Sequence, residues 1–74
     1  MYNIIIINST NNTQVFKATV KSLSMANKTI KKVASVSKDP NVLIATITDL
    51  SGRVISKVRI EKSPSGKIDL VPID

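Results

Sequence analysis

The sequence predicts a small α+β domain, in which an antiparallel sheet of about five strands carries one helix on one face. Short β-rich runs separated by loop residues occur on both sides of a single stretch with helical periodicity. A chain of 74 residues can build one hydrophobic core. We therefore expect one small basic domain over residues 1–74 with the element order β-β-α-β-β-β. An all-β small barrel or sandwich is the alternative.

The first two strands are predicted from composition and alternation. Residues 2–8 contain four consecutive Ile between Asn residues, a run with high β propensity that is too short for a helix. Loop-forming residues follow at 8–13, and residues 15–20 then alternate between apolar and polar side chains. This pattern predicts a hairpin whose second strand has one solvated face. On that strand Phe16, Ala18 and Val20 lie on one side, and Lys17, Thr19 and Lys21 on the other.

The periodicity changes to that of a helix over about residues 24–37. Either Ser22 or Ser24 can cap its start, and the Asp-Pro pair that ends at Pro40 should terminate it. Several β-branched residues make a strand over 29–37 the competing interpretation. Such a strand would point its apolar side chains to opposite faces, which a half-buried strand does not do. The helical apolar stripe comprises Leu23, Ala26, Ile30, Val33 and Ala34.

Three further strands are predicted at residues 42–48, 53–61 and 67–72, in a meander. Gly52 and Gly66 lie in the two connections, where a short hairpin loop needs a positive φ. The first of these runs is apolar on both faces, so we expect it to be central. In the second run we expect Val54, Val58 and Ile60 to face inward, and Lys57, Arg59 and Glu61 to face water.

One helix can cover only one face of such a sheet. The segment 2–8 is uncharged and lacks Pro, and it would promote aggregation at an exposed margin, so we expect it inside the sheet. Its second apolar face should be covered by curling of the sheet, by a second copy in a homodimer, or by another protein. The residues predicted for such an interface are Ile4, Ile5, Ile6, Ile7, Met25 and Val36, the last two lying off the apolar stripe of the helix.

The net charge of +6 is confined to the first half of the chain. Residues 1–38 contain six lysines and no acidic residue, whereas residues 39–74 contain five basic and five acidic residues. We expect a lysine-rich face to contact an anionic partner, either a nucleic-acid backbone or an acidic protein surface. The competing interpretation is a solvated face that only keeps the domain soluble. The predicted contact residues are Lys17, Lys21, Lys28, Lys31, Lys32 and Lys38.

The composition argues against catalysis. The chain has no Cys and no His, so the common thiol nucleophiles, imidazole bases and soft metal ligands are missing. Ser35 and Lys38 match a Ser-x-x-Lys pattern, but the companion motifs of acyl-transfer enzymes are absent. Both Gly residues belong to turns, which leaves no phosphate-cradling loop. We expect no enzyme activity, no catalytic residues, no metal and no cofactor.

These observations predict a non-enzymatic small basic binding protein. Neither a secretory signal nor a membrane span is expected, because residues 4–7 supply only four apolar positions after an uncharged start. We expect a cytoplasmic location, and the size and composition suit a regulator or inhibitor carried by a phage or mobile element. The alternative is a structural or assembly subunit that self-associates or docks through its apolar sheet face.

Overall fold

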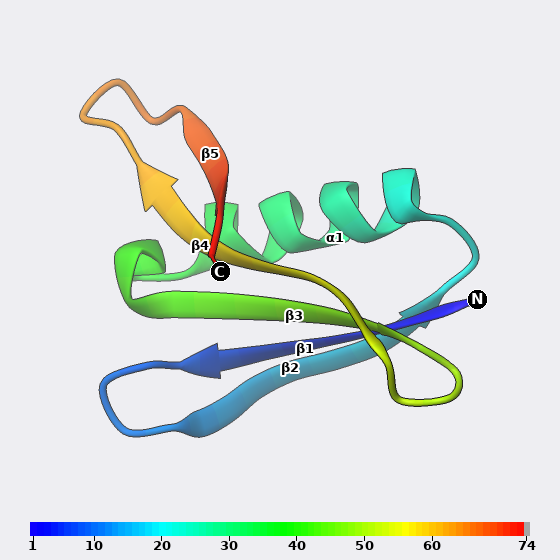
Figure 1. The fold of residues 1–74 in the computed structure, drawn as a ribbon. Helices are drawn as coiled ribbons and strands as arrows, with labels where there is room; N and C mark the ends of the chain where they lie inside the picture. Colours follow the sequence, from blue (N-terminus) through cyan, green and yellow to red (C-terminus); the bar gives the residue numbers. More distant parts are fainter. Residues whose placement is uncertain (74) are drawn as a thin grey trace.

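The computed structural model describes residues 1–73 and shows five antiparallel strands in one open sheet with a single helix along it (Figure 1). The predicted small α+β fold is confirmed. The alternative of a closed barrel or sandwich is wrong, because the sheet ends in two separate margins. The elements are β1 (Tyr2–Asn8), β2 (Thr13–Val20), α1 (Leu23–Val36), a 3-10 turn (Pro40–Val42), β3 (Leu43–Asp49), β4 (Val54–Lys62) and β5 (Ile68–Pro72).

The strand order across the sheet is β2-β1-β3-β4-β5. Strand β1 pairs antiparallel with β2 on one side and with β3 on the other, so the isoleucine-rich segment lies inside the sheet as predicted. Strand β3 is also central, between β1 and β4. Strands β2 and β5 form the two margins, and the β4–β5 hairpin projects beyond the rest of the sheet in Figure 1.

The core lies between α1 and the face of the sheet that carries Ile4 and Ile6. Both side chains are fully buried, and so is Ile30 at the centre of the helix stripe. Each such side chain contributes about 1.5–3 kcal/mol when it is removed from water. The other core members are Val20, Ala26, Ala34, Leu43, Ala45, Ile47, Val58 and Ile60.

Helix α1 has a side-chain hydrogen bond at each end. The Ser22 hydroxyl accepts a hydrogen bond from the Met25 backbone N–H at 3.2 Å, which satisfies one of the N–H groups that lack helical partners. At the other end, the Ser37 hydroxyl donates to the Val33 carbonyl at 2.9 Å. The predicted helix is therefore confirmed, and the competing strand over 29–37 is wrong. No helix within residues 1–73 combines the length and apolar character that crossing a bilayer requires.

A bulge corrects one prediction in β4. The register shifts between Ile47 and Thr48, which pairs Thr48 with Val54 and leaves Ile55 as the extra residue. Val54 therefore leaves the core face and is 58% exposed, so the prediction that it faces inward is wrong. The inward placement of the two later apolar residues, Val58 and Ile60, is confirmed.

The face of the sheet opposite α1 is partly exposed. Ile5, Ile7 and Ile44 lie on it and are half-buried, with no layer of residues 1–73 covering them. Lys17 lies directly across from Ile5 and Arg59 directly across from Ile44, so the aliphatic stems of these cations can shade the apolar side chains. Curling of the sheet does not supply the predicted second cover. Cover by a second copy or another protein stays a prediction.

The β3–β4 turn is held by one carboxylate and one glycine. Asp49 Oδ1 accepts hydrogen bonds from the Ser51 hydroxyl at 2.6 Å, the Ser51 N–H at 2.9 Å and the Arg53 N–H at 3.0 Å. These hydrogen bonds hold the pKa of Asp49 below its ordinary value of 3.8, and the bond from the Ser51 hydroxyl has the largest effect. Gly52 supplies the predicted positive φ, at +92°, and Gly66 does the same in the β4–β5 turn at +91°.

Substitutions of neighbouring isoleucines in β1 should report the difference between its two faces. Ile6→Ala should lower the free energy of unfolding by about 2–5 kcal/mol, because it opens a cavity beneath α1. Ile5→Ala should cost less than half as much, because its side chain already contacts water. Urea denaturation measures both values. Equal losses would contradict the half-exposed placement of Ile5.

The Asp49 turn should contribute to stability in a pH-dependent way. Because folding lowers this pKa, the contribution is fully present above the unfolded-state pKa and is lost as the pH falls through the lower, folded-state pKa. Asp49→Asn should therefore have a lower Tm than the parent at pH 7, and the difference should shrink below pH 3.8. Thermal denaturation followed by circular dichroism tests this. A Tm difference that stays constant down to pH 2 would count against the charged hydrogen bonds.

Candidate anion-binding surface

Three lysines cluster on the outward side of α1. At about 100° per residue, Lys28 and Lys32 each lie about 160° from the buried Ile30, in opposite senses, and Lys31 lies about 100° from it. All three side chains are exposed. We refer to Lys28, Lys31 and Lys32 as the α1 lysine face. Their spacings of three and four residues make them neighbours on the helix surface, where like charges destabilise the helix slightly.

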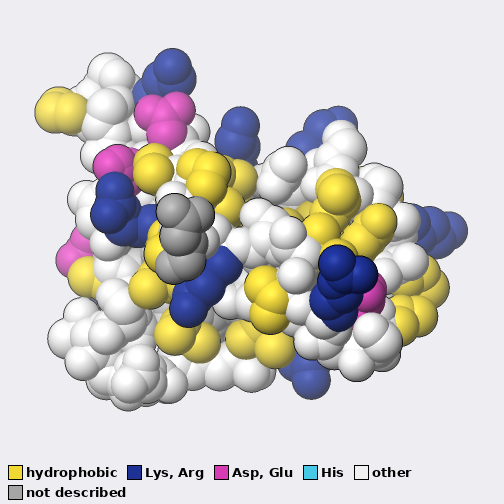
Figure 2. All heavy atoms as spheres, viewed as in Figure 1, with side chains coloured by type: hydrophobic (Ala, Val, Ile, Leu, Met, Phe, Trp, Pro, Cys, Tyr) yellow, Lys and Arg dark blue, Asp and Glu magenta, His cyan; other side chains and the backbone are white. Residues whose placement is uncertain are grey.

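Within residues 1–73 no carboxylate forms an ion pair with this face, although Asp69 of β5 lines the same hollow as Lys31. The two ion pairs found there join Arg59 to Glu61 at 3.3 Å and Lys67 to Asp69 at 4.0 Å, and both belong to β4, β5 and their connection. Residues 1–38 contain no acidic side chain. In Figure 2 the acidic side chains lie mostly at the end of the molecule formed by the β4–β5 hairpin. The positive charge of α1 is therefore available to an external anion.

The other predicted contact lysines do not all join this face. Lys17 pairs with Ile5, whereas its neighbour Ala18 pairs with the buried Ile4, so Lys17 lies on the side of the sheet away from α1. Lys21 is exposed just beyond the end of β2, and Lys38 is exposed just beyond the C-terminal cap of α1. The structure thus brings three of the six lysines together on one helix and places Lys17 on the opposite face.

A second group of cations, which was not predicted from the sequence as one surface, lies on the face of the sheet opposite α1. We refer to this surface as the helix-free face. The strand register places four residues side by side across β2, β1, β3 and β4, namely Lys17, Ile5, Thr46 and Lys57. Arg59 lies two residues beyond Lys57 on the same face of β4. The alternation predicted for residues 15–20 and 53–61 already contained this signal, because it placed these cations opposite the core-facing side chains. This surface mixes cations with half-buried isoleucines.

The predicted interface residues divide into three groups. Ile4 and Ile6 are fully buried under α1 and present no surface to a partner. Ile5 and Ile7 are half-buried on the helix-free face. Met25 and Val36 lie off the buried stripe of α1, as predicted, and are 48% and 80% exposed. The exposed apolar side chains therefore belong to two different surfaces.

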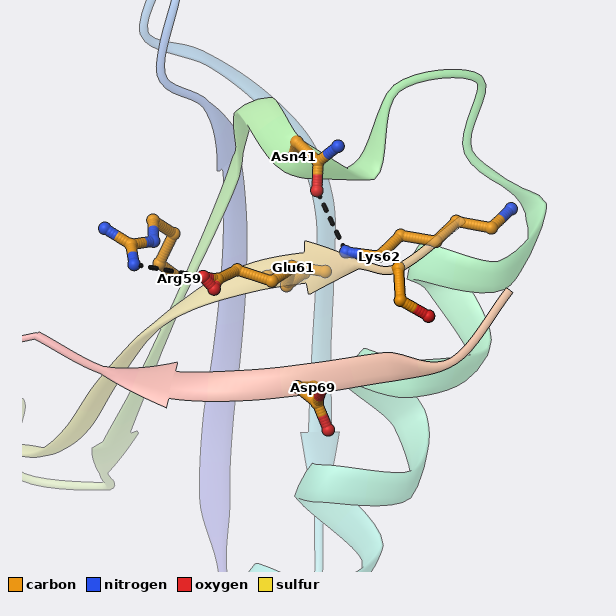
Figure 3. A pocket seen from close by; sticks show the side chains of 7 residues that line it. Asn41, Arg59, Glu61, Lys62 and Asp69 are labelled. Carbon is orange, nitrogen blue, oxygen red and sulfur yellow. Dashed lines mark hydrogen bonds and ion pairs between the residues drawn. The ribbon is translucent and has the colours of Figure 1, made fainter. Parts of the chain in front are cut away.

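An open hollow of about 500 Å³ lies beside β4 and β5, and Figure 3 shows the side chains that line it. The Asn41 side-chain carbonyl accepts a hydrogen bond from the Lys62 N–H at 2.9 Å, which ties the 3-10 turn to the end of β4. Glu61 and Asp69 lie opposite one another in the β4–β5 register, but each has a cation within 4.0 Å. The hollow is thus lined by side chains of both charges, so it favours neither an anionic nor a cationic ligand. Among residues 1–73 no three acidic side chains are grouped closely enough to hold a metal ion.

Two cationic surfaces therefore stand out, of which the α1 lysine face is the more purely charged. On the helix-free face the cations lie among isoleucine side chains, and one of them, Arg59, is paired with Glu61.

Comparison of the chain with protein-family models, with curated proteins and with solved structures found no match.

Proposed function

We propose that this chain is a non-enzymatic binding module that attaches to an anionic partner through the α1 lysine face. The observation that carries the proposal is the cluster of three exposed lysines on a helix whose half of the chain contains no acidic residue. Nucleic-acid backbones and acidic protein surfaces both offer the complementary charge. By masking such a surface, a module of this size would act as a regulator or inhibitor, of the kind carried by phages or mobile elements.

Nucleic-acid binding by this surface should depend on charge rather than base sequence. Lysine is a point charge that discriminates little between bases. Tyr2 and Phe16 are half-buried against the core and belong to β1 and β2, so the α1 lysine face itself carries no aromatic ring on which bases could stack. Each neutralised phosphate of duplex DNA releases counterions, so affinity should fall steeply as salt is raised.

A second candidate function is that of a structural or assembly subunit. The half-buried Ile5, Ile7 and Ile44 on the helix-free face support it, because apolar side chains gathered on an uncovered sheet favour contact with another protein. Two copies joined through this face would enclose Lys17 and Lys57 of both chains in one interface, and this like charge opposes a homodimer of this type. Size-exclusion chromatography with light scattering tests it, and a dimer at micromolar concentration would favour this second function.

The α1 lysine face can be tested by a gel shift with arbitrary duplex DNA. The parent chain should bind at 50 mM salt and lose about tenfold or more in affinity at 200 mM, because several phosphate contacts are screened. Lys28→Ala, Lys31→Ala and Lys32→Ala together should weaken binding by at least about tenfold at low salt. Alanine is a strong helix former, so the triple variant should stay folded.

The matched control replaces Lys57, Lys62 and Lys67 with alanine, which removes the same charge from β4 and the β4–β5 turn. This control should retain most of the affinity if the α1 lysine face makes the contact. Equal losses in both triple variants would show that net charge alone matters, which contradicts a localised site. No binding at 50 mM salt would remove the nucleic-acid form of the proposal and leave an acidic protein surface as the partner.

A further inference from the structure

An apolar groove of about 620 Å³ runs between the C-terminal half of α1 and the marginal strand β2. Its walls are mainly aliphatic and aromatic, and they include Val36, which is 80% exposed, and Val15, which is 50% exposed. No acidic residue lines it, and Lys32 of the α1 lysine face reaches its rim. The lining residues are Val15, Phe16, Thr29, Lys32, Val33, Val36 and Ser37.

A β-bulge in β2 turns an extra side chain toward this groove. The β1–β2 register pairs Ile6 with Phe16 but Ile7 with Gln14, so Val15 is left without a partner on β1. In a regular strand Val15 and Phe16 would point to opposite faces of the sheet. Both residues line the groove instead, which is the effect expected of a bulge that redirects a side chain.

The backbone beside the groove also has unused hydrogen-bonding capacity. Strand β2 is the first strand of the sheet and pairs with β1 on one side, and within residues 1–73 no strand lies along its other side. An extended peptide can pair with such a margin through backbone hydrogen bonds, while alternate side chains enter a neighbouring pocket. The groove between β2 and α1 is placed to receive those side chains.

Charge identifies the type of strand that this margin accepts. Lys17 and Lys21 lie on and just beyond β2, Lys32 lines the groove, and no carboxylate occurs in residues 1–38. A second copy of the chain adding its own β2 would bring two positively charged strands together, with no carboxylate in residues 1–38 of either copy to offset the repulsion. A strand that places Asp or Glu on the side of the margin away from α1 would instead meet Lys17 there.

We propose that β2 and the adjacent groove bind an extended segment of another protein, in which acidic residues alternate with aliphatic ones. The segment adds a sixth strand beside β2, with its aliphatic side chains in the groove and its carboxylates on the other side of the strand, near Lys17. This inference rests on the proposed function, since it names the anionic partner as protein rather than nucleic acid.

The test is a titration of the ¹⁵N-labelled chain, followed by NMR, with a peptide of alternating Glu and Val about ten residues long, which spans an eight-residue strand. Backbone amide shifts should change most within residues 15–20 and 33–37. The corresponding peptide of alternating Lys and Val should bind at least about tenfold more weakly. Shifts centred on Lys28, or on the helix-free face, would overturn the proposal.

Variants separate the groove from general electrostatic attraction. Val15→Gln with Val36→Gln removes exposed apolar contacts without changing charge, and it should weaken Glu-Val peptide binding by at least about tenfold. Leu50→Gln with Val54→Gln is the matched control, since these side chains are 65% and 58% exposed outside the groove, and it should leave binding unchanged.

The same measurements separate failure of the groove from failure of the proposed function. If the Glu-Val peptide or duplex DNA binds through the α1 lysine face but Val15→Gln with Val36→Gln has no effect, the groove proposal is wrong and the binding function stands. If neither anion binds at 50 mM salt, both fail. The chain could instead form a dimer whose dilution changes the amide shifts of β2. That result would show that a second copy, rather than an acidic strand, pairs with β2, and it would overturn this inference alone.

Discussion

The burial of Ile4 and Ile6 beneath α1 is the constraint on which the rest of the structure depends. These fully buried side chains lie in β1, which pairs with β2 on one side and β3 on the other. Both neighbouring strands and the helix therefore pack around one core. Residues 1–73 supply one α-helix with which to form that layer, and the opposite face of β1 therefore stays half-exposed. Because the apolar stripe of α1 is committed to the core, its lysines must lie outside.

This arrangement divides the surface of α1 into two parts of different chemistry. Its outward side carries Lys28, Lys31 and Lys32, whereas the flank beside β2 carries Val33 and Val36. The first is positively charged, and the second is apolar and lies next to the marginal strand β2. The proposed acidic segment would place its aliphatic side chains against Val33 and Val36 and its carboxylates near Lys17, on the other side of β2. The two surfaces join at Lys32, which belongs to both.

Most of the fold could be predicted from the sequence, because hydrophobic periodicity distinguishes helix from strand. The alternation of residues 16–20, the stripe centred on Ile30 and the two glycine turns all lie where they were expected. The bulges that redirect Val15 and Val54 could not be predicted, because each arises from the register between two strands rather than from either strand alone. The separation of Lys17 from the helix lysines was predictable in principle. The alternation of β2 already placed it opposite Phe16, and what was missing was knowledge of the face that α1 covers.

Amide hydrogen exchange tests most directly whether β1 forms the centre of this structure. With β2 and β3 paired on either side and α1 above, the amides of Ile4 to Ile7 should be among the slowest to exchange, at rates set by global unfolding. The amides of β5, a margin of the sheet, should exchange faster through local opening. Exchange of the β1 amides at the same rate as those of β5 would contradict a central β1, and with it the division between a covered face and a half-exposed one.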